Sequence, residues 1–498
     1  MKKYFKHILI LNLVFLFNCE DAIDIEQVGR LTPEVTFETV SDLEQGLYGL
    51  YTLHDNFYEV ALAANYTDEV AEGIGGGGQG RTGGHIFQLD ATNGGVASVW
   101  VGKYQEINYA NRILEAATLV EATDAAEQAK KDDILGQVYA LRAFSHFQLL
   151  SYFTTDYADD NALGVIKLDY VPSIADQSLR STNGEVFALI EDDLSKAQSL
   201  VEDQSNTELV SKDFILALRA RMAAYRQDYV LAETLATDLL NRYPLANRTN
   251  YPLVFEDLSD REVIFKLDRY LNGPYDDQPA SASFGTTGWL GGIFAFVNST
   301  IGGGAYYEFN RSLFNLFDPN DIRYETFLHP SSEVSPNYQT TADYFNDDIL
   351  IVGKYRGIPG QPLLQDQKIF RSSEMLLIIA EARIADNDLP GAAARIKQLR
   401  DARFATVQPL PTYGTQQEAY AALLDERRVE FAFEGHRWKD IKRLGVRAGK
   451  GVERDPLDAS TFNMIATLPA TDYRFTLPIP VAEFEANPQL RTQQNPGY

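Results

Sequence analysis

Hydrophobic side chains recur at helical spacing along most of the chain. Leu43, Leu47 and Leu50 lie three or four residues apart and would share one face of a helix. The same period predicts helical segments over Ser41–His54, Val99–Val120, Ala125–Phe153, Gly184–Val201, Lys212–Tyr243, Ser373–Arg403 and Gln416–Leu444. Ser41 and Glu44 have the spacing of a capping box at the first of these segments. The pattern therefore predicts a mostly α-helical protein.

Two of these segments resemble each other. Leu218 through Arg242 aligns with Ile378 through Ala402 without a gap, and each segment is interrupted midway by a polar turn. The matched small residues and turns are Ala220 with Ala380, Ala232 with Ala392, and Gln227-Asp228 with Asn387-Asp388. Small residues at this spacing let two antiparallel helices approach closely, so each segment predicts a helical hairpin. The pair resembles a tetratricopeptide repeat, although the aromatic and glycine positions of that repeat are missing.

The helical period fades between about residues 244 and 365. Glycine, proline, asparagine and aromatic residues become more frequent there, while Arg261–Tyr270 predicts a strand and Asn310–Phe317 a short helix. A loop-rich stretch of this length in a helical protein is usually functional. We therefore predict one domain over 37–498, with a helical scaffold at 37–243 and 366–450, a loop-rich ligand-binding insertion at about 244–365, and an extended tail at 451–498.

The N-terminus has the pattern of an export signal. Lys2 and Lys3 precede an apolar run, Ile8–Phe17, that is too short to cross a bilayer. Cys19 is the only cysteine, so an internal disulfide is excluded. Leu16-Phe17-Asn18-Cys19 resembles a bacterial lipobox, except that Asn18 stands where Gly, Ala or Ser is usual. This predicts a signal peptide at 1–18, lipid on Cys19 and a flexible tether at 19–36; an ordinary signal peptide with a chance cysteine is the alternative.

Composition narrows the classes of partner. Hydrophobic residues make up 45% and aromatic residues 12% of the chain, which is typical of a globular protein. The formal net charge of −26 argues against nucleic acid as a partner. It also makes a polyanionic ligand less expected, although a local basic pocket could override the global charge.

Several motifs, in order along the chain, resemble those of the SusD/RagB family. They are Trp100–Asn111, Ala140–Phe144, Arg371–Ala382 and Glu426–Arg443, together with the C-terminal segments Leu477–Phe484 and Gln494–Tyr498. The resemblance implies a tetratricopeptide-like fold and an outer-membrane lipoprotein that binds nutrients, mostly glycans. It also implies a SusC-like TonB-dependent transporter as the partner. Glu20-Asp21, next to the lipidated cysteine, resembles a surface-export signal, so we expect display at the cell surface.

Catalysis is not expected from the motifs. Glu430, Glu434 and His436 could serve as acid–base groups, but the i, i+4 spacing of acidic and basic residues in their run favours structural ion pairs. Gly75–Gly80 matches G-x-G-x-x-G without the strand and helix that dinucleotide binding requires. No cofactor is expected. Carboxylates at Asp318–Asp321 leave calcium open, although they do not match an EF-hand loop, and no metal site is predicted.

Sugar recognition needs exposed aromatic faces together with polar groups that bond hydroxyls, usually on loops over a rigid scaffold. The candidates near the glycine-rich segment are Tyr66, Asp68, Arg81, His85 and Phe87, with Asp68 expected at a ligand rim. Those near residues 270–310 are Tyr275, Phe284, Trp289, Phe294, Phe296, Tyr306 and Tyr307. Trp289, flanked by glycines, is the strongest candidate. Burial remains the alternative for each residue, and Trp100 and Trp438 are expected in the core.

These observations predict capture of a nutrient oligomer, most simply an oligosaccharide or polysaccharide, for delivery to the transporter. The Ile86–Gly95 and 270–310 loops are expected to form the ligand side and to face that partner. A surface glycan hydrolase is one alternative, and a peptide-binding member of the same family is another. The identity of the sugar and its linkage are not encoded in a pattern that the sequence alone reveals.

Overall fold

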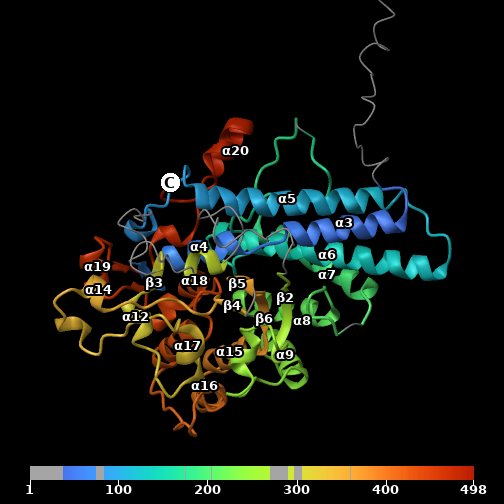
Figure 1. Ribbon diagram of the computed structural model, residues 1–498. Coiled ribbons are helices and arrows are strands. Elements are labelled where there is room, and N and C mark those ends of the chain that lie inside the picture. The colour runs from blue at the N-terminus through green and yellow to red at the C-terminus, as the bar shows by residue number, and fades with distance from the viewer. Residues whose placement is uncertain are drawn as a thin grey trace, which may run out of the picture.

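The computed structural model describes residues 37–73, 83–173, 175–203, 205–269, 290–295, 305–358 and 361–498. Three helices pack side by side along one edge of the fold (Figure 1): α3 (Val40–Leu53), α5 (Gly94–Ala116) and α6 (Ala125–Phe153). The limits of α6 are those predicted. The capping box of α3 is formed by Thr39 and Asp42, two residues before the predicted pair, because Thr39 has the extended backbone that a cap requires.

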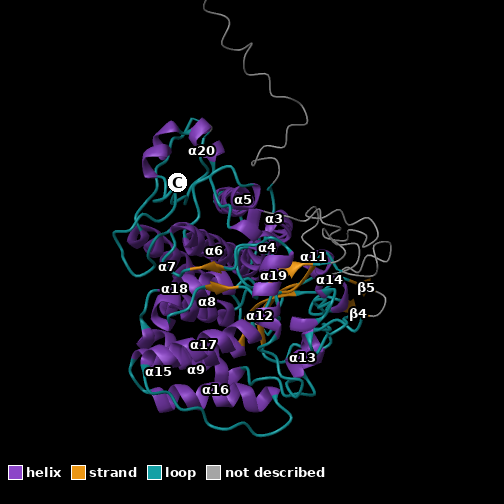
Figure 2. Ribbon diagram, turned by 90° about the vertical axis from the view of Figure 1, so that its left-hand side faces the viewer, coloured by secondary structure: helices purple, strands orange, loops and turns teal. Residues whose placement is uncertain are grey.

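The scaffold continues as packed helical hairpins. Its further helices are α7 (Asn183–Leu200), α8 (Lys212–Tyr225), α9 (Tyr229–Arg242), α15 (Ser372–Ala385), α16 (Leu389–Arg403), α17 (Gln416–Glu430) and α18 (Arg437–Ala448). Contacts join α8 to α9, α15 to α16 and α17 to α18, and α15 also packs on α9. Figure 2 shows α9, α15, α16 and α17 gathered at one end of the molecule. The predicted mostly helical, tetratricopeptide-like architecture is confirmed.

The two hairpins that resemble each other in sequence turn in the same way. Gln227 and Asn387, at matched positions, both adopt left-handed backbone with φ of 64° and 62°. The next residue in each, Asp228 or Asp388, then accepts a hydrogen bond from the first turn of the following helix. The breaks predicted within Lys212–Tyr243 and Ser373–Arg403 are therefore confirmed. A third break, between α17 and α18 around Gly435 (φ 78°), was not predicted.

The region between the two halves of the scaffold consists of short elements. They are α10 (Tyr251–Val254), β2 (Val263–Leu267), α11 (Leu290–Phe294), β3 (Tyr307–Phe309), α12 (Arg311–Phe314), α13 (Ile322–Phe327), η4 (Tyr338–Thr340), α14 (Tyr344–Asp347), β4 (Gly357–Ile358) and β5 (Gln361–Pro362). The strand predicted over Arg261–Tyr270 is the shorter β2. It pairs antiparallel with β6 (Gln367–Arg371), which leads directly into α15 and so joins this region to the scaffold.

Three further short pairings complete the strands of the described residues, one of them β4 antiparallel to β5. β1 (Val70–Glu72) follows α4 (Phe57–Asn65) and pairs antiparallel with β3. β7 (Val452–Glu453) pairs antiparallel with β8 (Thr467–Leu468) beyond the end of α18. Each strand contributes only two or three residues, so packing against helices, rather than a continuous sheet, holds them in place.

The C-terminal tail contains short helices: α19 (Pro456–Thr461), η5 (Tyr473–Phe475), α20 (Val481–Ala486) and η6 (Pro488–Gln493). The backbone of Leu477 donates a hydrogen bond to Tyr152 O (2.9 Å). The guanidinium of Arg180 donates to Asn495 Oδ1 (2.9 Å) and to Phe153 O (2.8 Å). The last part of the tail, from Leu477 to Asn495, is therefore attached to the end of α6.

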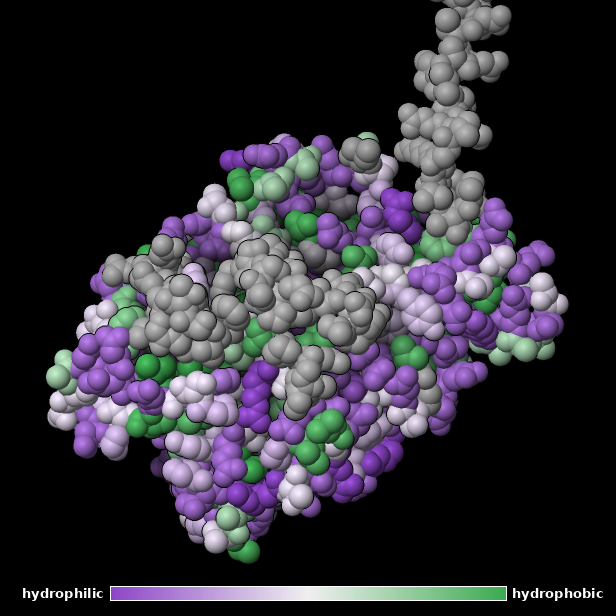
Figure 3. Space-filling view, in the orientation of Figure 1, coloured by the Kyte–Doolittle hydropathy of each residue, from purple (hydrophilic) through white to green (hydrophobic). Residues whose placement is uncertain are grey.

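The core contains both tryptophans that were expected there. Trp100 and Trp438 are each 1% exposed, and they pack against Phe153 and Tyr152 at the end of α6. On the face shown in Figure 3, the described residues form a mainly polar surface with small separate groups of apolar residues. Among the described helices, none combines the length and the apolar character needed to cross a bilayer.

Candidate functional site

Candidate residues from two distant parts of the sequence meet at the β1–β3 pair. Val70 lies opposite Phe309 and Glu72 opposite Tyr307, while the N–H of Gly73 donates to Tyr306 O (2.8 Å). The short helix η2 (Gly83–Ile86) lies beside this pair, since the rings of His85 and Tyr307 are 6.3 Å apart, edge to face. We call β1, β3, η2 and the end of α4 the β1–β3 framework.

Arg454, a residue that the sequence pattern did not single out, holds the framework together. Its guanidinium donates to Thr67 O (2.8 Å) and His85 O (2.6 Å), and also to the carbonyls of Asn65 and Gly84. It also lies 4.2 Å from the centre of the Phe87 ring. One arginine, directly after β7, thus joins the end of α4 to η2. Carbonyl partners leave no trace in a sequence motif, so this role could be found only from the structure.

Asp68 serves inside the framework rather than at a ligand rim. Its side chain has no exposed surface, and its two oxygens accept from Nε and Nη2 of Arg437, both at 2.8 Å. Burial opposes ionisation, but Arg428 and Arg437 hold the pKa of Asp68 well below its usual range. The predicted rim position is therefore replaced by a buried ion pair with α18. This pairing positions β1 against the scaffold.

Most other described candidates are also interior. Tyr66, His85 and Phe87 are each buried, and the Tyr66 hydroxyl donates to Gln88 O (3.1 Å). Phe294 and Tyr307 are buried as well, whereas Tyr306 is partly exposed. The remaining candidates lie outside the described residues: Cys19, Arg81, Tyr275, Phe284, Trp289 and Phe296. The buried candidates pack in the interior and hold the backbone in place. Among the described candidates, Tyr306 is the one with an exposed surface.

The framework also holds the described residues that border the segments with the remaining candidates. A Cβ on Gly73 would collide with the carbonyl of Ala305, so the residues that border segments 74–82 and 296–304 touch each other. Arg269, which borders segment 270–289, pairs with Asp55 (3.0 Å) just before α4. At the other border of that segment, α11 packs on α4 and β3. Three separate segments are thus attached to one framework.

Two buried carboxyl groups, one just before β1 and one on α19, have raised pKa values. Burial raises the pKa of Glu69 to about 7, and its Oε1 accepts from the N–H of Phe433 (2.8 Å). Burial also raises the pKa of Asp458 to about 7, where it accepts from Tyr344 and from the backbone of Arg311, both at 2.6 Å. A cavity of about 10 Å³ beside Asp458 has room for one water but not for a sugar.

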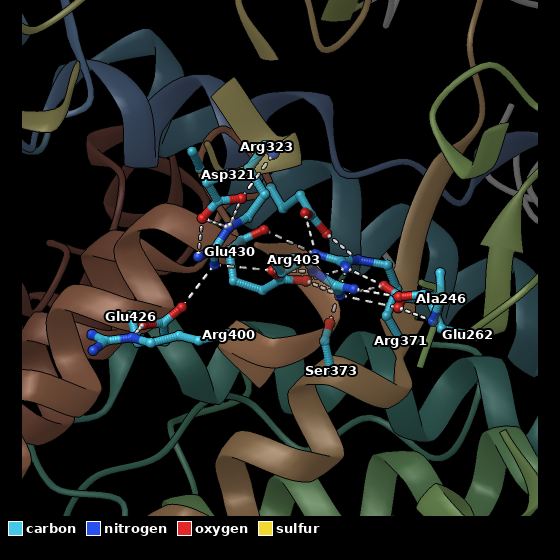
Figure 4. A network of polar contacts seen from close by, with 12 residues as sticks. Ala246, Glu262, Asp321, Arg323, Arg371, Ser373, Arg400, Arg403, Glu426 and Glu430 are labelled. Carbon is cyan, nitrogen blue, oxygen red and sulfur yellow. Dashed lines mark hydrogen bonds and ion pairs between the residues drawn. The ribbon is translucent and has the colours of Figure 1, made fainter. Parts of the chain in front are cut away.

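A central ion-pair network lies between the short elements and the scaffold (Figure 4). Arg371 pairs with Glu262 (2.7 Å) and Glu430 (2.8 Å), and Arg403 pairs with the same two glutamates at 3.0 and 2.9 Å. All four side chains are at most 1% exposed. Arg323 extends the network to Asp321, Glu426 and Glu430. The prediction that the charged run beginning at Glu426 forms structural ion pairs is confirmed.

The remaining acid–base candidates of that run have packing partners too. Glu434 pairs with Lys354 and with Arg371 (2.7 Å). The His436 ring stacks on Phe431 at 4.7 Å, and burial together with nearby arginines lowers its pKa well below the usual value. Within the described ranges, no group of three or more His, Cys, Asp or Glu side chains is arranged to hold a metal ion.

Comparisons with known proteins place these features in a family. The model of the SusD family matches residues 360–498, and a model described as starch-binding associating with outer membrane matches residues 36–225. SusD-like protein P2 of Formosa agariphila is 26% identical over 553 aligned positions, covering all of both chains.

Solved structures share the fold. A SusD superfamily protein from Bacteroides thetaiotaomicron matches with a TM-score of 0.76 and 23% identity, covering 92% of this chain and 100% of that one. A putative sugar binding protein from Bacteroides vulgatus matches with a TM-score of 0.69 and 22% identity, covering 93% of this chain and 99% of that one. At these identities the likeness shows a common fold.

Proposed function

We propose, from the premise that this chain belongs to the SusD/RagB family, that it captures a nutrient oligomer at the cell surface and delivers it to a SusC-like TonB-dependent transporter. The oligomer is most simply an oligosaccharide, since one matching family is described as starch-binding and one structural relative as sugar binding. The observation that carries the proposal is the β1–β3 framework. It joins the described borders of three segments that carry predicted sugar-binding residues to a single scaffold.

The framework contains buried residues with structural roles and borders segments with proposed contact residues, which supports a binding function. Asp68, Tyr66 and Arg454 use their polar groups inside the protein, so they hold the described backbone of the framework in place. Trp289 and the other candidates on those segments are proposed to contact the sugar. Tyr306 is proposed to extend that surface, because it is partly exposed at the start of β3. Contact residues placed over a rigid scaffold are the usual arrangement of a binding site.

The first test measures oligosaccharide binding by calorimetry for Trp289→Ala and Tyr306→Ala. We expect Trp289→Ala to weaken binding by roughly 1–3 kcal/mol, as for loss of a central aromatic contact, and Tyr306→Ala to weaken it less. Tyr48→Ala is the matched control, since Tyr48 is 47% exposed on α3, away from the framework. Unchanged affinity with a lowered melting temperature for Trp289→Ala would show that Trp289 belongs to the core.

The alternatives need separate measurements. Release of reducing ends from a polysaccharide by the purified protein would favour a hydrolase, and we expect none. Calorimetry with peptides of matched length would detect a peptide-binding member of the family, and we expect binding to glycans instead. Genes for polysaccharide-degrading enzymes beside this one would narrow the choice of sugar.

Attachment to the outer membrane is proposed through lipid on Cys19. Several acyl chains hold a protein at a membrane stably, whereas one chain alone is marginal. Cys19→Ala should therefore release soluble protein, while Asn18→Gly, which restores the usual lipobox residue, should remain attached. Membrane attachment of the Cys19→Ala protein after a high-salt wash would contradict the lipoprotein assignment.

Delivery requires an interface with the transporter. A permanent complex of this kind buries more than about 2,000 Å², so we expect co-purification with a large β-barrel from mild detergent. Deleting the transporter should abolish uptake but leave binding intact. Recovery of the native protein only as a free monomer, with uptake unaffected by its own deletion, would refute the proposed partnership.

A further inference from the structure

Arg447, near the end of α18, is surrounded by neutral hydrogen-bonding groups. Its Nη1 donates to the hydroxyls of Tyr229 (2.6 Å) and Tyr420 (3.3 Å), and its Nη2 donates to Oε1 of Gln227. Across the described residues, no carboxylate forms an ion pair with it. The side chain is partly exposed, so its charge can be reached from solvent. In a chain with 70 acidic and 44 basic residues, an arginine without an acidic partner needs a reason.

The guanidinium opens onto a cavity of about 560 Å³, within the range that holds small ligands. We call this cavity the Arg447 groove; it is lined by Gln227, Tyr229, Ala385, Gln416, Gln417, Tyr420 and Arg447. No acidic side chain is among these described lining residues. Their amides and hydroxyls are suited to bonding the hydroxyl groups of a sugar. The groove meets a second cavity of about 210 Å³ that shares Gln227 and Tyr229 with it.

The acidic side chains around the second cavity do not neutralise the positive charge of Arg447. Glu381 is there, but it forms two hydrogen bonds of 2.8 Å with Arg443. Asp156 is there as well and lies on the side of Lys442. Lys442 donates to two backbone carbonyls, those of Ser151 and Thr154, and lines only the second cavity.

The ends of the neighbouring helices do not add positive charge to the groove. The α9 and α17 helices begin at the groove, with Tyr229 and Gln416 as their first residues. The α15 and α18 helices end there, close to Ala385 and Arg447. The α8 helix also ends here, at Tyr225 just before Gln227, so the helix ends bring no net positive charge to the groove. Among the described side chains that line the groove, the guanidinium of Arg447 is the only charged group.

We propose that the Arg447 groove binds the anionic group of an acidic saccharide, either the carboxylate of a hexuronate or a sulfate ester. A guanidinium can hold either oxyanion through two parallel hydrogen bonds, which a neutral hydroxyl cannot match. The net charge of −26 would repel a long polyanion, so a short or sparsely charged saccharide suits the groove best.

The groove is separate from the β1–β3 framework. Arg437, which pairs with Asp68 of the framework, begins α18, whereas Arg447 lies near its end, about 15 Å away along the axis. The inference rests on the proposed function only in taking a saccharide as the carrier of the anion. Failure at one site can therefore be distinguished from failure at the other.

The test measures calorimetric binding of trigalacturonate, a sulfated disaccharide and maltotriose to the full chain and its variants. We expect Arg447→Gln to weaken binding of the acidic probes at least tenfold and to leave maltotriose unchanged. Arg447→Lys should retain part of the affinity, because it keeps the charge but loses the paired geometry. Arg242→Gln is the matched control: this arginine lies on α9 and pairs with Asp213 and Asp238.

The outcomes separate the two anions and the two sites. Arg447-dependent binding of only one acidic probe would support the proposal and identify its anion. Trp289→Ala should leave this Arg447-dependent binding unchanged. Equal binding of the acidic probes to wild type and Arg447→Gln would overturn the proposal. So would an equal loss of acidic and neutral probes, since the groove would then recognise hydroxyls rather than charge.

Discussion

Arg403 and Arg447 are arginines near the ends of two helices, but their surroundings differ. Arg403 is fully buried and pairs with Glu262 and Glu430 in the central network. Arg447 is partly exposed and has tyrosine hydroxyls and an amide where Arg403 has carboxylates. Both lie close to tyrosine rings, so the contrast is in charge compensation rather than in packing.

The contrast separates a charge used for folding from one available for binding. A buried charge must be neutralised inside the protein, because the cost of removing it from water is several kcal/mol. The Arg403 site meets this requirement by joining Glu262 of the short elements to Glu430 of the scaffold. A partly exposed arginine remains hydrated and needs no internal partner, so it can exchange water for an external oxyanion.

The largest expected effect is on stability. Arg403→Ala should lower the free energy of unfolding by about 3–5 kcal/mol, because it leaves Glu262 and Glu430 with less positive charge in a dry site. Arg447→Ala and the exposed control Arg242→Ala should each cost about 1 kcal/mol or less. Urea denaturation of the three variants makes the comparison. A small loss for Arg403→Ala would show that the network does not hold the two parts together.

The next largest effect is the pH dependence of folding stability, which should differ between the central network and the β1–β3 framework. Burial raises the pKa of Glu69 from 4.5 to about 7, so the folded protein favours its protonated form. Its stabilising contribution is fully present below pH 4.5 and is lost as the pH rises to about 7. At about 1.4 kcal/mol for each pH unit, the loss is about 3 kcal/mol. Glu69→Gln, which cannot ionise, should gain this much relative to wild type between pH 4.5 and 7.5.

The stability contribution of the central network should change with pH in the opposite direction. Burial opposes ionisation of Glu430, but Arg403 and Arg371 hold its pKa below the usual 4.5. Its contribution is therefore present above pH 4.5 and is lost as the medium becomes more acidic. Thermal unfolding of wild type, Glu69→Gln and the exposed control Asp192→Asn between pH 3 and 8 tests both slopes. Parallel curves for wild type and Glu69→Gln above pH 4.5 would contradict the assignment to Glu69.

The sequence predicted the scaffold well because its helices carry local signals. The α6 segment has a continuous apolar period and Asp124 as its cap, and both of its limits were predicted. The hairpin turns at Gln227 and Asn387 were visible as polar interruptions. The break between α17 and α18 was missed because apolar residues continue through it, with Gly435 as the only local signal.

The site was less predictable because its determinants are distant in sequence. Asp68 and His85 are polar and adjoin a glycine-rich segment, which favoured an exposed position. Arg437 and Arg454, more than 300 residues later in the chain, instead bury them by bonding the Asp68 carboxylate and the His85 carbonyl. The same holds for Arg447: its groove depends on Gln227, which no local pattern connects to the end of α18.

The smallest expected effect is on ligand affinity, and the matched position in the internal repeat provides the control. Gln227 and Asn387 occupy matched left-handed turns, where glycine is favoured, so Gln227→Gly and Asn387→Gly should each change stability by no more than about 1 kcal/mol. Of these two residues, only Gln227 accepts a hydrogen bond from Arg447. Losing one such bond, worth about 1 kcal/mol, should weaken trigalacturonate binding roughly threefold to tenfold in Gln227→Gly and leave Asn387→Gly at the wild-type value. Equal affinities for the two variants would mean that Gln227 does not orient the guanidinium for its ligand.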